Sequence, residues 1–215
     1  MNLKYKSYWR KSGLKGKWGN IFLNHLNDYK PKKFLEIGVF CGVTARNTCD
    51  FLNYHHKKNF KYIGIDLFGG KKNSNTEEIE PDFLKNQRFA NPLKNFYYNI
   101  ILKENLNTIK SVEKLLERYK ENTKLIKGDT NNELKKINLS NVDYTFIDGG
   151  HSYNTVTNDL KILYEAMKGK NKVLLCDDYG KESYIPEVKS AIDDFAKKNN
   201  LSINLIENRF AEIIT

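Results

Sequence analysis

Phe34-Leu-Glu-Ile-Gly-Val-Phe-Cys-Gly-Val-Thr44 is a short apolar run that ends at Gly38, with Gly42 placed just before a helical pattern. This order is typical of a buried parallel strand that turns tightly into a helix. Glycine allows a sharp backbone turn or a ligand in van der Waals contact. The amides that begin the helix favour a negative group such as a carboxylate. The stretch therefore predicts an α/β fold with a ligand at this turn.

The glycine spacing distinguishes two kinds of nucleotide site. Phe40 and Val43 stand where the three-glycine dinucleotide motif has its second and third glycines, and the bulk of Phe40 argues against a pyrophosphate here. The spacing Glu36-x-Gly38-x-x-x-Gly42 resembles the first motif of class I S-adenosylmethionine-dependent methyltransferases. The resemblance implies that Glu36, Gly38 and Gly42 bind S-adenosylmethionine.

Apolar strands and helical stripes alternate around this turn, which predicts a mostly parallel sheet. We expect a Rossmann-like, doubly wound, seven-stranded sheet whose C-terminal hairpin adds an antiparallel strand. The predicted strands span residues 33–38, 61–66, 124–127, 142–147, 172–176, 201–206 and 209–214. The predicted helices span residues 18–29, 43–55, 106–119 and 153–167, and a last one begins at Pro186.

The length of 215 residues predicts one domain, 1–215, with an N-terminal arm and helix over 1–30. Residues 71–103 exceed what a strand–helix–strand connection needs, and such long connections are usually functional or disordered. The aromatic residues in this stretch favour an ordered lid or substrate-recognition insertion, with disorder as the alternative.

Composition limits the class of partner. The net charge of +10 would attract polyanions, but the basic residues are spread along the chain, which favours a solvated basic surface over a nucleic-acid site. Three cysteines without a C-x-x-C pair, no signal-like N-terminus and no membrane-length apolar run predict a soluble, cytoplasmic protein. The oligomeric state stays open, a homo-oligomer included.

Acidic residues follow the predicted strands. In an open α/β sheet, ligands bind outside the carboxyl ends of the strands. For any one acid the alternative is a turn or cap residue, but the set as a whole favours a site. The acids at or near these strand ends are Glu36, Asp66, Asp129, Asp148, Asp177 and Asp178.

Two of these positions match cofactor contacts of the methyltransferases. Asp66 corresponds to the acid that binds ribose hydroxyls, and Asp129 with Thr130 to the region that borders the adenine. Asp129 could equally be the N-cap of a short helix, since Asn131 and Asn132 follow it.

The segment Asp148-Gly-Gly-His151-Ser-Tyr153, with the pair Asp177-Asp178, resembles the metal-dependent macrocin-type and aminocoumarin-type sugar O-methyltransferases. The resemblance implies that Asp148, Asp177 and Asp178 hold Mg²⁺ or Mn²⁺, and that His151 and Asp148 are catalytic, with His151 the base. Oxygen ligands suit such hard cations, and an imidazole can accept a proton at neutral pH. Alternatively, His151 is a turn residue that caps the next helix, a role that Ser152 could also fill.

The function expected from these motifs is metal-assisted O-methylation of a hydroxylated small molecule, with sugars among the acceptors. The alternative is an RNA or protein methyltransferase that uses the basic surface. Against it, the Asn/Asp-Pro-Pro-Tyr motif of N-methylating enzymes is missing after the fourth strand, where the chain reads Asp148-Gly-Gly-His151. A binding protein without catalysis or an NAD-linked dehydrogenase is a third reading, and the missing third glycine disfavours the dehydrogenase.

Overall fold

The computed structural model describes residues 4–69 and 87–215, and within them the chain forms a three-layer α/β fold. The strands are β1 (Lys33–Ile37), β2 (Lys61–Asp66), β3 (Thr123–Lys127), β4 (Tyr144–Ile147), β5 (Val173–Cys176), β6 (Asn204–Ile206) and β7 (Phe210–Ile214). The longer helices are α1 (Lys17–Tyr29), α2 (Val43–His56), α5 (Ile109–Leu116), α7 (Tyr153–Met167) and α8 (Pro186–Lys198). Shorter helices are α4 (Pro92–Phe96), α6 (Thr130–Glu133), the π-helix Tyr97–Ile101, and 3-10 turns at Glu117–Tyr119, Leu134–Lys136 and Leu139–Asn141.

The strands form one sheet in the order β3-β2-β1-β4-β5-β7-β6. β1 pairs in parallel with β2 on one side and with β4 on the other. The strand order therefore reverses its direction between β1 and β4, which makes this the topological switch point of the sheet. β7 runs antiparallel to both β5 and β6. The predicted fold class, a mostly parallel seven-stranded sheet with a C-terminal antiparallel strand, is confirmed.

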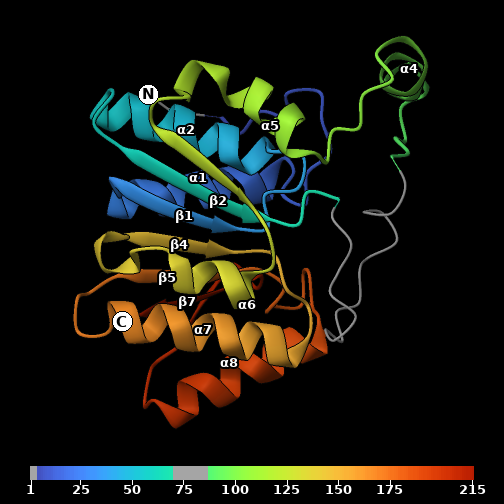
Figure 1. Ribbon diagram of the computed structural model, residues 1–215. Coiled ribbons are helices and arrows are strands. Elements are labelled where there is room, and N and C mark those ends of the chain that lie inside the picture. The colour runs from blue at the N-terminus through green and yellow to red at the C-terminus, as the bar shows by residue number, and fades with distance from the viewer. Residues whose placement is uncertain (1–3, 70–86) are drawn as a thin grey trace.

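Helices cover both faces of the sheet. α1, α2 and α5 pack on one face, and α6, α7 and α8 on the other (Figure 1). Alternate residues of each strand therefore enter different cores: Phe34 faces α1 and α2, whereas Leu35 faces α7 and α8. This explains why β1 reads as continuous apolar sequence rather than as an alternating pattern.

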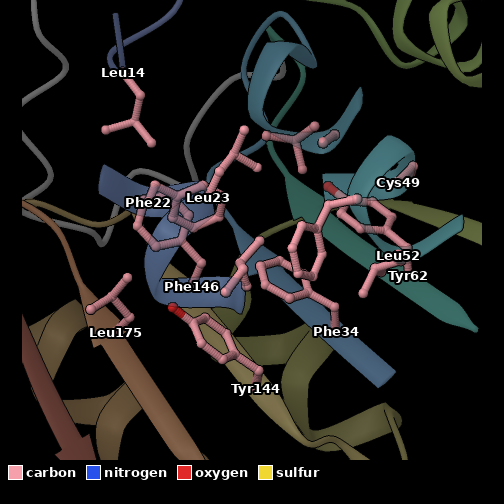
Figure 2. Packing of buried hydrophobic residues seen from close by; sticks show 14 of the residues in the cluster. Leu14, Phe22, Leu23, Phe34, Cys49, Leu52, Tyr62, Tyr144, Phe146 and Leu175 are labelled. Carbon is pink, nitrogen blue, oxygen red and sulfur yellow. The ribbon is translucent and has the colours of Figure 1, made fainter. Parts of the chain in front are cut away.

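Aromatic rings fill the core beneath α1 and α2 (Figure 2). The Phe34 ring stacks between those of Tyr62 and Tyr144, with centroid distances of 6.0 and 5.2 Å, and Phe22 packs on Phe146. Burying each large apolar side chain contributes roughly 1.5–3 kcal/mol, which makes this core a main source of stability. The core also fixes the positions of β1 and β4, the two strands that flank the switch.

One predicted helix is shorter in the structure than the sequence indicates. The helix expected over 106–119 begins only at Ile109, because Thr108 is its N-cap and accepts a hydrogen bond from the Ser111 amide. Residues 70–86, which include the first half of the insertion predicted over 71–103, lie outside the described residues. The end of that stretch forms α4 and the π-helix, which extend away from the sheet layers (Figure 1).

Within the described residues, no helix is both long and apolar enough to cross a bilayer.

Candidate functional site

Backbone hydrogen bonds align the carboxyl ends of the central strands. The amide of Gly38 donates to Ile65 O (3.0 Å), that of Asp148 to Ile37 O (2.8 Å), and that of Asp177 to Ile147 O (2.9 Å). The first residue after β1, β4 and β5 therefore lies in one row along the edge of the sheet. This row spans the point where the strand order switches, the usual place for a ligand in such folds.

The turn after β1 depends on its glycines. Gly38 has φ of +89°, and a Cβ on it would lie 1.9 Å from the backbone oxygen of Asp148. Gly42, with φ of +76°, is the N-cap of α2 and leaves no room for a Cβ beside Val112. Only glycine allows the turn after β1 to lie this close to the end of β4. The tight strand-to-helix turn predicted from the sequence is therefore present, and its binding of a ligand stays a prediction.

Asp66 joins the end of β2 to this turn. Its Oδ2 accepts a hydrogen bond from the Phe40 amide (2.8 Å), and its Oδ1 accepts one from the Phe68 amide (2.6 Å). The acid therefore lies beside the glycine turn, and its contact with ribose hydroxyls stays a prediction.

Glu36 lies inside the core beneath the turn. Its side chain has no exposed surface, Oε2 accepts a hydrogen bond from the Tyr62 hydroxyl (2.6 Å), and Oε1 has no hydrogen-bond partner among the described residues. Burial raises the pKa of this carboxyl to about 8, with the negative charge of Asp66 adding to the effect. Glu36 is therefore neutral over much of the physiological range, and its contact with a cofactor stays a prediction.

Asp129 caps a helix, the alternative that the sequence left open. Its carboxylate accepts hydrogen bonds from the amide and side chain of Asn131, at the start of α6. The neighbouring Thr130 donates to the buried Asp159 (3.0 Å). Both residues lie just beyond β3, on the same edge of the sheet as Asp66. Asp129 can therefore cap α6 and still border the adenine of a cofactor, a role that stays a prediction.

His151 and Asp178 face each other from the loops after β4 and β5. His151 Nε2 lies 3.3 Å from Asp178 Oδ2, and both side chains are largely buried. Ser152, not His151, caps α7, accepting a hydrogen bond from the Thr155 amide. The capping alternative for His151 is therefore filled by its neighbour, and the imidazole is placed beside a carboxylate instead.

Asp177 is bound by an arginine that the sequence analysis did not single out. Arg209 donates from Nε to Oδ1 (2.7 Å) and from Nη2 to Oδ2 (2.6 Å), a bidentate pair in which both residues are buried. Oδ1 also accepts hydrogen bonds from the Asp178 amide and the Ser183 hydroxyl. A signal existed: several acids at one sheet edge require a cationic partner. Sequence spacing could not show which basic residue supplies it.

Asp148 lies close enough to Asp177 and Asp178 for their charges to act on it. Burial, followed by the charges of Asp177 and Asp178, raises its pKa well above the ordinary range, and the charge of Arg209 opposes the rise. The structure thus brings together Asp148, Asp177, Asp178 and His151.

This arrangement does not match the divalent-cation site implied by the sequence resemblance. Among residues 4–69 and 87–215, no three His, Cys, Asp or Glu side chains are placed to hold a metal ion. Asp177 has both oxygens in the Arg209 pair, and Asp178 lies against His151.

The N-terminal arm, residues 4–16, crosses this edge of the molecule. Asn47 on α2 exchanges two hydrogen bonds with the Lys6 backbone, both 2.8 Å. Arg10 donates to the backbone oxygens of Cys41 (3.2 Å) and Ser111 (3.0 Å). A Cβ on Gly13 would lie 3.7 Å from Asp148 Oδ2. The arm therefore reaches the acidic row, which consists of Asp148, Asp177 and Asp178.

Comparison with protein families gives one match over most of the chain. A family model described as a methyltransferase domain matches residues 35–179, from β1 to just after Asp178. A comparison with curated protein sequences found no match.

Three solved structures with a similar fold are described as methyltransferases. The O-methyltransferase NovP is 17% identical, with 92% of this chain and 80% of that chain covered and a TM-score of 0.61. The calicheamicin methyltransferase CalS11 is 16% identical, with 90% and 77% covered and a TM-score of 0.60. PaMTH1 of Podospora anserina, solved with S-adenosylhomocysteine bound, is 15% identical, with 93% and 79% covered and a TM-score of 0.58. At these identities the likeness concerns the fold.

Proposed function

Because the chain belongs to the methyltransferase-domain family, we propose that it transfers a methyl group from S-adenosylmethionine to a hydroxyl of a small molecule. The observation that carries the proposal is the pair of His151 and Asp178 beside Asp148, at the sheet edge where the family match ends. An imidazole held by a carboxylate is suited to remove a proton from a hydroxyl.

Residues around the glycine turn would bind the methyl donor. Asp66 would accept hydrogen bonds from the ribose hydroxyls. Gly38 and Gly42 would allow the cofactor to approach the backbone closely, and Asp129 with Thr130 would border the adenine. Glu36, neutral and buried, would support the turn from below. When bound, S-adenosylmethionine supplies a methyl group on a positively charged sulfur.

The chain's own part in the reaction is proton removal and orientation. Asp178 would hold the proton on Nε2 of His151, which makes Nδ1 the atom that accepts the acceptor's hydroxyl proton. The carboxylate would then stabilise the imidazolium that results. Asp148, whose pKa is raised, would donate a hydrogen bond to the oxygen of the same hydroxyl and orient it.

Because Asp177 is paired with Arg209, only Asp148 and Asp178 of the three implied aspartates would be left as ligands for a divalent cation. No step of this mechanism therefore passes through such an ion. Mg²⁺ or Mn²⁺ therefore enters as a condition to vary in the assay.

A sugar or another compact hydroxylated ring is the acceptor class that we propose. One structural neighbour supports a sugar, since CalS11 is described as a TDP-rhamnose 3'-O-methyltransferase, and NovP, described as an O-methyltransferase, supports transfer to an oxygen. In this chain, Trp9 of the arm packs on Tyr97 and Tyr98 with centroid distances of 5.2 and 5.9 Å, and remains partly exposed. An aromatic surface of this kind suits the apolar face of a ring.

The test is methyl transfer from radiolabelled S-adenosylmethionine to three sets of acceptors: nucleotide sugars and small polyols, RNA, and denatured protein. Thermal stability with S-adenosylhomocysteine or NAD⁺ shows which cofactor the native state binds. We expect a stability increase with S-adenosylhomocysteine alone and label in the small molecules. Label in RNA or protein instead would replace the acceptor class, and stabilisation by NAD⁺ alone would refute the proposed cofactor.

A further inference from the structure

Arg209 occupies the place in the acidic row where a cation is required. Three carboxylates, those of Asp148, Asp177 and Asp178, lie near one another, and Arg209 acts electrostatically on all three. Such a group is tolerated only with positive charge nearby. In a metal site that charge comes from the ion, whereas a guanidinium stays protonated at any physiological pH.

The contact with Asp177 leaves little for an ion to bind. Four hydrogen bonds reach this carboxylate: two from Arg209, one from the Asp178 amide and one from the Ser183 hydroxyl. Oδ1 accepts three of these bonds and Oδ2 accepts one, so a divalent ion at the remaining position of Oδ2 would lie against the positive guanidinium. A divalent ion would have to displace the guanidinium from a buried bidentate pair, leaving a buried charge without a partner.

The backbone holds Arg209 in this position. Its carbonyl accepts a hydrogen bond from the Gly180 amide (2.8 Å), and its own amide donates to Ile206 O (3.0 Å). A Cβ on Gly180 would lie 2.0 Å from the backbone oxygen of Asn208, so the β6–β7 turn presses directly on the loop that carries the acids. The guanidinium carbon also lies 5.4 Å from the Trp18 ring centroid. Swinging the side chain away would break contacts on several sides.

We propose that Arg209 permanently replaces the divalent cation at this sheet edge, so that the native protein does not bind Mg²⁺ or Mn²⁺ at Asp177. Arg209 is then a positioning residue: it balances the charge of the acidic row and fixes Asp177, which in turn bonds the Asp178 amide. Asp178 is thereby held opposite His151. What this does for catalysis rests on the proposed function, but ion binding itself does not.

The test measures Mn²⁺ binding by electron paramagnetic resonance, and melting temperature with and without Mn²⁺, on the full chain. Wild type is expected to leave Mn²⁺ free and to keep its melting temperature. Arg209→Lys retains a charge and is expected to behave in the same way. Arg209→Met keeps the volume but removes the charge, so its melting temperature should fall. Mn²⁺ at about 100 times its Kd should then raise that temperature by roughly 5–10 °C.

A double variant, Arg209→Met with Asp177→Asn, is the matched control and should lose the response to Mn²⁺. Stoichiometric Mn²⁺ binding by wild type that Asp177→Asn removes would overturn the proposal, even if Arg209→Met fails to fold. Equal Mn²⁺ responses of Arg209→Met and the double variant would also overturn it. None of these readouts uses turnover, so an absence of methyl transfer would count against the proposed function alone.

Discussion

Nε2 of His151 lies 3.3 Å from Oδ2 of Asp178, joining the loops that follow β4 and β5. The two residues are far apart in the sequence, and the parallel pairing of β4 with β5 brings them together. Asp178 has φ of +62°, a backbone conformation that turns it away from the path of β5. The pair is the basis of the proposed proton removal.

Replacing the base should slow the reaction without affecting donor binding. His151→Ala is expected to reduce turnover by about 10²–10⁴-fold, the usual contribution of a positioned general base. The Kd for S-adenosylhomocysteine, measured by calorimetry, should stay near that of wild type. His56→Ala, at the far end of α2, is the matched control and should retain full turnover. Wild-type turnover in His151→Ala would remove the assignment.

Asp178 should matter only through His151. Asp178→Asn is expected to lower turnover roughly 10-fold or more, because the amide can stabilise the wrong imidazole tautomer and cannot balance the imidazolium charge. Adding Asp178→Asn to His151→Ala should then cause little further loss, since residues that act as a unit are not additive. Fully additive effects in this double-mutant cycle would show that the two residues act separately.

Asp66 should govern affinity for the methyl donor. Asp66→Ala removes both the predicted ribose contact and the hydrogen bond from the Phe40 amide. Hydrogen bonds to charged groups contribute about 1.5–3 kcal/mol, so the Kd for S-adenosylhomocysteine should rise roughly 10–100-fold. Asp28→Ala, an exposed acid on α1, serves as the control. An unchanged Kd for Asp66→Ala would place the donor elsewhere.

Chelation should have little effect on the reaction. The sequence resemblance implies that EDTA abolishes turnover, whereas the Arg209–Asp177 pair leads us to expect turnover in EDTA within about twofold of that with added Mg²⁺. The measurement is the initial rate of methyl transfer after dialysis against EDTA and after Mg²⁺ is restored. Loss of the rate in EDTA with full recovery on Mg²⁺ would favour the metal-assisted mechanism.

Glu36 should make stability depend on pH. Its pKa is about 8 in the folded chain against an ordinary value of 4.5, so between these values the folded state binds more protons than the unfolded state. The free energy of unfolding should therefore fall as pH rises from about 4.5 to 8, by up to about 1.4 kcal/mol per pH unit. Glu36→Gln mimics the neutral acid and should lack this component. Denaturant unfolding at pH 5, 6, 7 and 8 tests the difference.

The exposed Glu165 provides a control for this experiment, because Glu165→Gln changes the same kind of group outside the core. Wild type and Glu165→Gln should follow parallel curves, while Glu36→Gln diverges from both. If all three curves are parallel, Glu36 is ionised in the folded chain.

Sequence reasoning predicted the strands well because local signals and tertiary structure agree there. β1 is an apolar run that ends in a glycine required by a close backbone approach, and β2 is an apolar run that ends in Asp66. The edge where the acids gather followed from the rule for parallel sheets. Ser152 could be named as a cap because its residue type and its position before α7 both indicate one.

Arg209 could not be predicted in the same way, because its role depends on a contact across 32 residues. The chain has 36 lysines and arginines, and nothing local marks this one. Its burial results from the turn between β6 and β7, where Glu207 and Asn208 adopt left-handed backbone conformations.

The β6–β7 hairpin has a consequence for how the molecule assembles. A nascent chain exposes the acids after β4 and β5 before the ribosome has made Arg209, so repulsion there persists until the last hairpin docks. Formation of the reactive edge should therefore depend on docking of the β6–β7 hairpin against the loop after β5.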